Sequence, residues 1–523
     1  MSDEKSLIKS AGIIGLSTFT SRVLGLLRDV FSASMFGTGL VWDAFLIAFM
    51  VPNLLRRLLG EGALTGSFIP VFTEYLHKKP REEVWKLVSI IFTLLILGLL
   101  VLVLLGIWVV GLVLNNFSLS AKTSLILRLT RIMLPYIFFV SLAALSMGIL
   151  NSFKHFILPA LGPVILNICW IGALFYLCPR FGHSLEQKIL GLAIGILAGG
   201  VAQLAIQIPA LIKKGFNRFN IRFNLNLAHS GVRRVGYLMA PAVLGLAVTQ
   251  INVVVDVILG LILGHGAISA LYYGNRLMQL PLGVFGIAMG TAVLPTMAQH
   301  VAKNEIEKLK ITLSFALRMV FFITIPAAVG LMSLRLPIMK TLFQHGQFSS
   351  LSTARAANTL FFYSLGLFSY AGVKVIVPCF YSLQDTKTPV KIGIIALVSN
   401  IVLNLILMRP LRESGLALAT AISSTINLIA LFLILRKRIG NIDGKKIFSS
   451  FKRILFSALV MGIFCWSVSN SIFGLKSLPA QLTGLVGVVC GGIIIFAACS
   501  FIFRVEELRM VSKWVLKKRI NRY

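Results

Sequence analysis

The sequence is dominated by long apolar stretches, which recur at short intervals along its 523 residues. A stretch of about 20 mostly apolar residues is what an α-helix needs to cross the hydrocarbon core of a bilayer. Because 57% of the residues are hydrophobic and 13% are charged, most of the chain cannot face water. This excludes a soluble multidomain enzyme and a disordered chain, and six cysteines are too few for a disulfide scaffold. We therefore predict an all-α polytopic membrane protein with about fourteen transmembrane helices, at residues 11–36, 41–76, 87–114, 124–150, 156–178, 188–212, 235–263, 267–299, 311–333, 356–381, 391–408, 414–435, 454–473 and 481–503.

The basic residues alternate between the loops that join these segments. The chain has 50 Lys and Arg against 17 Asp and Glu, a net charge of +33. One set of alternate loops holds 32 of the cations and the other set holds 10, so the positive-inside rule places the first set and both termini in the cytoplasm. A regular alternation is unlike the basic, aromatic-rich groove that binds nucleic acid, so we expect no nucleic-acid partner. The cytoplasmic set comprises residues 1–10, 77–86, 151–156, 213–234, 300–310, 382–391, 436–453 and 504–523.

Two halves of the chain show weak internal similarity. The run Ala63–Lys78 matches Ala288–Lys303 at an offset of 225 residues, including a proline and the closing lysine. The stretch Ser152–Pro159 matches Ser382–Pro389 near an offset of 230. Transporters are commonly built from such repeats, with the substrate site between the halves near the bilayer midplane. We predict two six-helix lobes, at residues 1–230 and 231–440, followed at 441–523 by two extra helices and an amphipathic tail.

Eight cations lie inside the spans or at their edges. Placing an ionisable residue at the centre of a membrane helix costs roughly 2.5–3.5 kcal/mol of insertion free energy, so such residues usually face a wet cavity, a partner or a substrate. The first two spans contain four arginines, Arg22, Arg28, Arg56 and Arg57. They also contain three carboxylates, Asp29, Asp43 and Glu61. The positive surplus suits a multiply charged anion such as a diphosphate, whose oxygens the guanidinium fork binds in bidentate fashion. The alternative is that Arg–carboxylate pairs, above all Arg57 with Glu61, only hold the two spans together. Arg276 is the single cation of the eighth span.

A second polar group falls in the C-terminal half. Asp256 is the one carboxylate of the seventh span, Asn400 and Asn404 share a face of the eleventh, and Thr420 is in the twelfth. Such oxygens suit Na⁺, and a lone membrane carboxylate can also carry a proton. The alternative is a buried aspartate that hydrogen-bonds neighbouring helices. We expect no cofactor and no certain metal site, because the histidines lack metal-ligand spacing and no nucleotide-binding loop is present.

Three blocks of the sequence resemble a known family. They are residues 21–75, which include FGTGLVWDAFLIAFMVPNLLRRLLGEGALTGSFIP, then LYYGNRLMQLPLGVFGIAMGTAVLP at 271–295 and YSLQDTKTPVKIG at 381–393. This order is similar to that of the MurJ (MviN) lipid II flippases, in the multidrug/oligosaccharidyl-lipid/polysaccharide (MOP) exporter superfamily. The resemblance implies a monomeric transporter, not an enzyme, which moves lipid II from the cytoplasmic to the outer face of a bacterial inner membrane by alternating access. It also implies that the last two helices form a groove for the lipid tail, and that membrane lipids and cell-wall synthesis proteins are partners.

The resemblance also assigns roles to the charged residues of the spans. The family's functional arginines fall on Arg22, Arg28, Arg56 and Arg276, and its acidic positions fall on Asp29, Asp43 and Glu61. Other functions remain open on the sequence: a flippase for another polyprenyl-diphosphate oligosaccharide of O-antigen type, or an exporter of cationic drugs, which a positive cavity disfavours. A membrane transferase would need an acidic metal motif such as D-D-x-x-D, and a scaffold would not need arginines within its spans.

Overall fold

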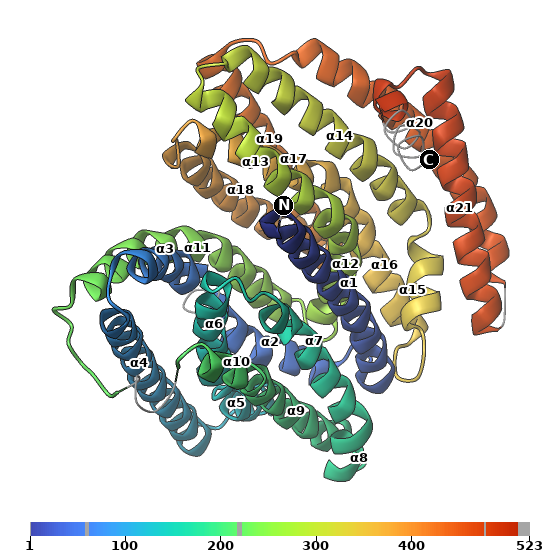
Figure 1. The fold of residues 1–523 in the computed structure, drawn as a ribbon. Helices are drawn as coiled ribbons and strands as arrows, with labels where there is room; N and C mark the ends of the chain where they lie inside the picture. Colours follow the sequence, from blue (N-terminus) through green and yellow to red (C-terminus); the bar gives the residue numbers. More distant parts are fainter. Residues whose placement is uncertain (1, 58–61, 217–221, 475–476, 511–523) are drawn as a thin grey trace. The chain divides into compact units, whose positions relative to one another are not determined.

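The computed structural model describes residues 2–57, 62–216, 222–474 and 477–510, and the secondary structure in these ranges is helical (Figure 1). The chain forms two compact units, which divide between Ile251 and Asn252 inside one long helix. The all-α class predicted from the sequence is confirmed. The predicted Glu61 and residues 511–523 of the predicted amphipathic tail lie outside the described residues.

The described residues of the first unit form ten α-helices and the π-helical turn η2, followed by the start of the helix that crosses the boundary. They are α1 (Ser2–Phe36), α2 (Leu40–Leu55), α3 (Ala63–Lys78), α4 (Arg81–Asn116), α5 (Ala121–Met133), α6 (Tyr136–Ser152), α7 (Ile157–Gly172), η2 (Ala173–Leu177), α8 (Cys178–Phe181), α9 (Leu185–Ala205), α10 (Ile208–Lys213) and α11 (Ser230–Ile262). A core of large apolar side chains, including Phe68, Phe72 and Trp85, joins α3, α4 and α6.

The described residues of the second unit form the end of α11, ten further α-helices and the π-helical turn η3. They are α12 (Ala267–Pro281), η3 (Leu282–Gly286), α13 (Ile287–Ala302), α14 (Ile306–Ser333), α15 (Arg335–Phe343), α16 (Ser350–Leu365), α17 (Leu367–Ser382), α18 (Lys387–Leu411), α19 (Glu413–Ile439), α20 (Gly444–Phe473) and α21 (Leu478–Ile502). Its core is centred on α14, which packs against α13, α17 and α20.

Most of the predicted spans appear as membrane-length helices. Among the described residues, nine helices are long and apolar enough to cross a membrane. Two further spans are bent helix pairs, α5 with α6 at 40° and α16 with α17 at 42°. These account for eleven of the fourteen predicted segments, and the remaining three correspond to α1, to α2 with α3, and to α11. The exact number of fourteen stays a prediction.

The second predicted span is not one helix. The pair Pro52–Asn53 indicates a helix break within residues 41–76, but α2 continues through Pro52 to Leu55, and a separate helix α3 begins at Ala63. The expected position of the break was wrong because a proline inside a membrane helix removes one backbone donor without ending the helix when neighbours satisfy the freed carbonyl. Arg56 and Arg57 therefore stand at the C-terminal end of α2.

The matched stretches Ser152–Pro159 and Ser382–Pro389 share one local geometry, although the repeat of two six-helix lobes stays a prediction. The helices α6 and α17 end at Ser152 and Ser382, and the residues two further on, Lys154 and Gln384, have φ values of 58° and 59°. In both turns the residue after that donates its amide to a carbonyl five residues earlier, His155 to Leu150 and Asp385 to Phe380, as in a Schellman cap. Both turns lead into helices that carry a proline near the start, α7 and α18.

Loops that we assigned to one face of the membrane contact each other. At the face expected to be outside, Arg355 Nε lies 2.5 Å from Glu413 Oε1, and Arg355 Nη1 donates to the His265 carbonyl at 2.8 Å. At the expected cytoplasmic face, Asp385 pairs with Arg438. The alternation of loops is thus consistent with the structure of the second unit, whereas the choice of which face is cytoplasmic stays a prediction from the charge count.

The described residues of the predicted third part of the chain, 441–474 and 477–510, pack within the second unit. Helix α20 lies against α14, and α21 lies against α20 (Figure 1). Just beyond α21, Glu506 and Glu507 reach back to the buried Arg318 of α14, at 2.9 and 2.8 Å from its Nη1 atom. The domain boundaries at 230 and 440, and the lipid-tail groove expected of α20 and α21, stay predictions.

The contact of Glu506 predicts a pH-dependent contribution to stability. The hydrogen bond from Arg318, with Lys446 nearby, lowers the pKa of Glu506 below its ordinary value of 4.5. Because the lowered pKa belongs to the folded state, this stabilisation is present above pH 4.5 and is lost as the pH falls through the folded-state pKa. The Glu506 side chain is half exposed, so we expect Glu506→Gln to lower thermal stability by less than about 1 kcal/mol at pH 7. Thermal unfolding of both proteins from pH 7 to pH 3 checks this, because a gap that persists at pH 3 contradicts the assignment.

Candidate functional site

Arg28 and Asp29 lie buried on α1, where this helix packs against α7. The Nε and Nη2 atoms of Arg28 donate to Asp29 Oδ1 at 3.0 and 2.7 Å. The Nη1 atom donates to Asn167 Oδ1 on α7 at 3.1 Å, and Asn167 Nδ2 donates to the Ser21 carbonyl at 3.0 Å. The Arg28–Asp29 pair therefore joins α1 to α7. Arg28 therefore has a structural role. That it also binds substrate stays a prediction.

An aromatic cluster surrounds this ion pair. The Arg28 guanidinium lies 4.4 Å from the centre of the Trp170 ring, and Trp170 Nε1 donates to Ser32 Oγ at 3.1 Å. Phe45 and Phe49 of α2 pack edge-on against Trp170. Sequence reasoning missed Asn167 and Trp170. A polar residue and a tryptophan three positions apart on an otherwise apolar span are the signal that could have identified them.

Arg22 lies six residues before Arg28 on α1 and is half-buried. Within the described part of the chain it forms no hydrogen bond or ion pair, in contrast to Arg28. A half-buried guanidinium in an apolar span keeps its five donors for water or for a ligand. Of the predicted arginines in the first unit, Arg22 is the one whose surroundings best fit the binding of an anion.

The remaining predicted charges of the first unit lie on α2. Asp43 is fully buried in the first turn of α2, and its Oδ2 atom lies 3.8 Å from Lys122 Nζ of α5. We had assigned Lys122 only to a loop, so the structure adds a partner that the sequence did not predict. At the other end of α2, Arg56 is half-buried and Arg57 is exposed. The proposed Arg57–Glu61 pair involves a residue outside the described ranges.

Arg276 belongs to the second unit. It is half-buried on α12, beside Asn275, which accepts a hydrogen bond from Gln279 of the same helix and also hydrogen-bonds Tyr363 of α16. The side chain of Asn275, next to Arg276, is thus positioned by hydrogen bonds to Gln279 and Tyr363. The predicted role of Arg276 in substrate binding stays a prediction.

The four residues of the predicted cation site come together in the second unit. Asn404 Nδ2 donates to Asp256 Oδ1 at 2.8 Å and to Asn400 Oδ1 at 2.9 Å. Asn400 Nδ2 lies 3.3 Å from Thr420 Oγ1 and 3.4 Å from Ser423 Oγ, a hydroxyl that the sequence reasoning did not include. The helices α11, α18 and α19 are therefore joined by one polar network. This arrangement agrees with both interpretations made from the sequence, a cation site and a structural hydrogen-bond network.

One atom of this network is informative about ligands. Asn404 is fully buried, and its Oδ1 atom has no hydrogen-bond partner among the described residues. A buried carbonyl oxygen without a donor costs free energy, which a bound cation would recover. One carboxylate with amide and hydroxyl oxygens suits a hard cation such as Na⁺. The described residues contain no cluster of three or more His, Cys, Asp or Glu side chains that suits a transition metal.

Comparison with known proteins gives a consistent assignment. The family model described as "Lipid II flippase MurJ" matches residues 32–483. A probable lipid II flippase MurJ of Vibrio cholerae is 36% identical over 500 residues, covering 92% of this chain and 94% of that protein. The lipid II flippase MurJ of Burkholderia cenocepacia is 34% identical over 496 residues, again covering 92% and 94%.

Solved structures extend the comparison to the fold. A lipid II flippase MurJ in an inward closed conformation superposes with a TM-score of 0.77 at 30% identity, covering 94% of this chain and 98% of that chain. An inward-facing multidrug resistance transporter of the MATE family, from the MOP superfamily, has a TM-score of 0.64 at 14% identity, which shows a shared fold alone. The matching family model, relatives at more than 30% identity over nine-tenths of the chain and the membrane-length helices agree, and this multi-pass membrane protein belongs to the MurJ family of lipid II flippases.

Proposed function

We propose that the protein flips lipid II, a polyprenyl-diphosphate-linked disaccharide-peptide, from the cytoplasmic to the outer face of the bacterial inner membrane. The observation that carries this proposal is the MurJ family match over residues 32–483. The physical problem is that a charged diphosphate head cannot cross about 30 Å of hydrocarbon unaided, whereas the polyprenyl tail can remain in lipid. The protein acts as a transporter and not as an enzyme, since moving the head across the membrane requires no covalent bond to form or break.

In this proposal arginine side chains replace the water around the diphosphate. Arg22 has no ion-pair partner among the described residues and is half-buried, which supports its contact with the anion. Arg56 and Arg276 are half-buried and belong to the same substrate set. Arg28 contributes chiefly by holding α1 against α7, next to Arg22. Bidentate guanidinium–phosphate contacts of this kind are among the strongest hydrogen bonds in proteins.

The likeness to MATE transporters does not favour drug export. At 14% identity it supports the shared fold, and the surplus of arginines over carboxylates in the first two spans would repel a cationic drug. A flippase for an O-antigen-type carrier lipid shares the diphosphate chemistry, so the sugar-peptide part of the head distinguishes the two cargoes. Peptidoglycan synthesis proteins are the partners that fit lipid II as cargo.

Complementation tests the function. In cells depleted of their own lipid II flippase, we expect this chain to restore growth and to place lipid II on the outer face, measured by its susceptibility to an externally added enzyme that cleaves it. Identifying the lipid-linked sugars that reach the outer face shows which cargo the protein moves. Growth arrest with the protein correctly inserted in the membrane, or accumulation of an O-antigen carrier instead, would contradict the proposal.

We also propose that a monovalent cation, Na⁺ or H⁺, drives transport through the Asp256 network. Removing the charge with Asp256→Asn keeps the size of the side chain, so we expect cation-dependent transport to fall at least about tenfold, because the carboxylate provides the charge that compensates the cation. Transport is measured in proteoliposomes with an imposed Na⁺ gradient or, separately, an imposed pH gradient. Ser314→Ala, at a buried serine of α14 outside this network, serves as the control. An unchanged response of Asp256→Asn to both gradients leaves the network with a structural role alone.

A further inference from the structure

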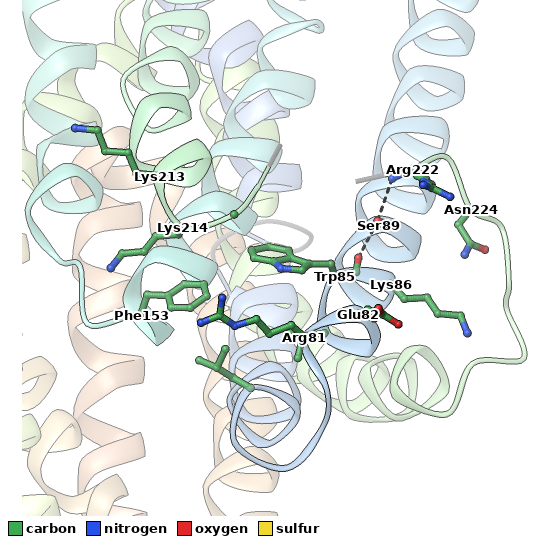
Figure 2. Close-up of a pocket in the computed structure, with 13 residues that line it drawn as sticks. Arg81, Glu82, Trp85, Lys86, Ser89, Phe153, Lys213, Lys214, Arg222 and Asn224 are labelled. Atoms are coloured by element: carbon green, nitrogen blue, oxygen red, sulfur yellow. Dashed lines mark hydrogen bonds between the residues drawn. The ribbon is translucent and has the colours of Figure 1, made fainter. Parts of the chain in front are cut away.

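A large polar cavity lies in the first unit, on elements other than α1 and α2. It has a volume of about 1060 Å³ and lies at the N-terminal end of α4, where its walls also include residues near the ends of α6 and α10 and the segment 222–224 (Figure 2). The three loops that contribute to it, 77–86, 151–156 and 213–234, all belong to the set that the charge count places in the cytoplasm. The cavity is therefore expected at the cytoplasmic surface of the membrane.

The lining of this cavity is basic. Four cationic side chains in it form no ion pair among the described residues, namely Arg81, Lys213, Lys214 and Arg222. A fifth, Lys86, pairs with Glu83 at 3.2 Å. Glu82 is the one carboxylate among the lining residues that the structure describes. The local surplus of positive charge gives the cavity a potential that attracts anions, and its concave shape strengthens this potential.

Two aromatic rings form an apolar wall beside these charges. Trp85 is 8% exposed, and its ring lies 6.4 Å from that of Phe153, centroid to centroid. The Nζ atom of Lys214 lies 5.8 Å from the Phe153 ring centre. Figure 2 shows Arg81, Trp85 and Phe153 on one side of α4 and Arg222 on the other. The wall offers a flat apolar face to whatever carbon skeleton accompanies the anion.

The backbone that carries the cations is fixed on both sides of α4. The amide of Arg222 donates to Ser89 Oγ at 3.3 Å, and the amide of Asn224 donates to Thr93 Oγ1 at 3.3 Å. On the opposite side, Gly215 has a φ of 105°, and a Cβ atom there would lie 2.9 Å from Trp85 Cζ2. The chain that follows Lys214 therefore approaches Trp85 as closely as a glycine allows. The cationic side chains are thus attached to a backbone that is already ordered, which lowers the entropic cost of binding.

We propose that this cavity binds a phosphate group carried by a larger polar molecule, either the headgroup of an anionic phospholipid or a soluble phosphate ester. Arg81 provides a planar guanidinium group that matches phosphate oxygens, and Lys214 adds a point charge. Arg222, on the other side of α4, adds to the positive potential of the cavity. A bare phosphate ion would leave most of the volume empty, because cavities of this size enclose whole small molecules. This inference goes beyond the flipping of lipid II and does not depend on it.

The test compares two sources of phosphate on the full chain. The variant carries Arg81→Gln, Lys214→Gln and Arg222→Gln together, and Lys303→Gln is the matched control, since it removes a charge from an exposed residue of another expected cytoplasmic loop. Retention of phosphatidylglycerol over phosphatidylcholine is measured by native mass spectrometry, and binding of glycerol 3-phosphate by calorimetry. For the source that binds, we expect the triple variant to bind at least about tenfold more weakly than the original chain and the control, and the difference to shrink as salt rises.

The outcomes separate the two sources. Binding of phosphatidylglycerol alone assigns the cavity to lipid, and binding of glycerol 3-phosphate assigns it to a soluble ester. Equal binding by the original chain and the triple variant, or no binding of either probe by the original chain, overturns the proposal. A second variant, Arg81→Lys with Arg222→Lys, keeps the charge, so partial retention of binding shows that a loss in the glutamine variant reflects charge rather than misfolding. None of these readouts requires transport, so failure of the proposed flipping would leave them unaffected.

Discussion

Replacing Arg22 by alanine is expected to abolish complementation of a flippase-depleted strain while leaving the protein folded and in the membrane. The reason is that Arg22 is half-buried in an apolar helix and forms no hydrogen bond or ion pair within the described residues, so its loss breaks no internal polar contact there. A lost charge-assisted contact to the diphosphate costs roughly 1.5–3 kcal/mol, which slows transport about tenfold to 150-fold if it is made in the rate-limiting state. Transport of lipid II in proteoliposomes measures the effect.

Two further variants make the Arg22 result specific. Arg22→Lys keeps the charge but not the planar fork, so we expect an intermediate rate. Arg131→Ala is the matched control, because it makes the same change at an exposed arginine at the end of α5. Wild-type transport by Arg22→Ala would show that the anion binds elsewhere. A loss in Arg131→Ala as large as that in Arg22→Ala would show that any missing span cation has the same effect.

Replacing Arg28 by alanine is expected to act on folding before it acts on transport. The guanidinium donates to buried Asp29 and to Asn167 and lies over Trp170, so its removal takes a charged partner from a carboxylate that is fully buried. Breaking a buried ion pair in this way costs roughly 3–5 kcal/mol. We expect a large fall in the thermal unfolding temperature in detergent, measured by intrinsic fluorescence.

A double variant separates the structural and binding roles of Arg28. Because both charges disappear together, Arg28→Leu with Asp29→Leu should recover much of the stability lost in Arg28→Ala. A stable double variant that does not transport would assign substrate binding to Arg28, and a stable double variant that transports normally would leave it with the structural role alone. No recovery of stability in the double variant would contradict the ion-pair explanation.

Sequence reasoning was most successful where a pattern of many residues carried the information. Membrane spans are identified by about 20 consecutive apolar residues, and a single substitution hardly alters such a signal. The matched stretches at 152–159 and 382–389 share a helix end with positive φ, at Lys154 and Gln384, whereas the repeat as a whole stays a prediction. The predicted cation group was found because Asn400 and Asn404 are four residues apart and thus share a helix face.

Sequence reasoning was least successful for the partners of individual charges. Arg28 is grouped by the sequence with the charges of the first two spans, but it also donates to Asn167, which is 139 residues away on α7. Lys122 was counted as a loop cation, yet it lies 3.8 Å from buried Asp43. Such contacts depend on which helices pack together and on their rotation about their axes, and neither quantity is encoded in the spacing along one helix.

The sequence by itself determined that this chain is an all-α membrane protein with a positive surplus in its first spans. It also predicted about fourteen helices, and its motifs pointed to the MurJ family. These conclusions depend on local hydrophobicity, on the count of charges and on blocks of sequence that are contiguous in the chain. The tertiary structure decided which arginine is neutralised and which is available, because the charge of Arg28 is compensated by the neighbouring Asp29 in a geometry that also requires α7. It also revealed the basic cavity at the end of α4, because its walls come from segments more than 120 residues apart that meet only when the helices pack.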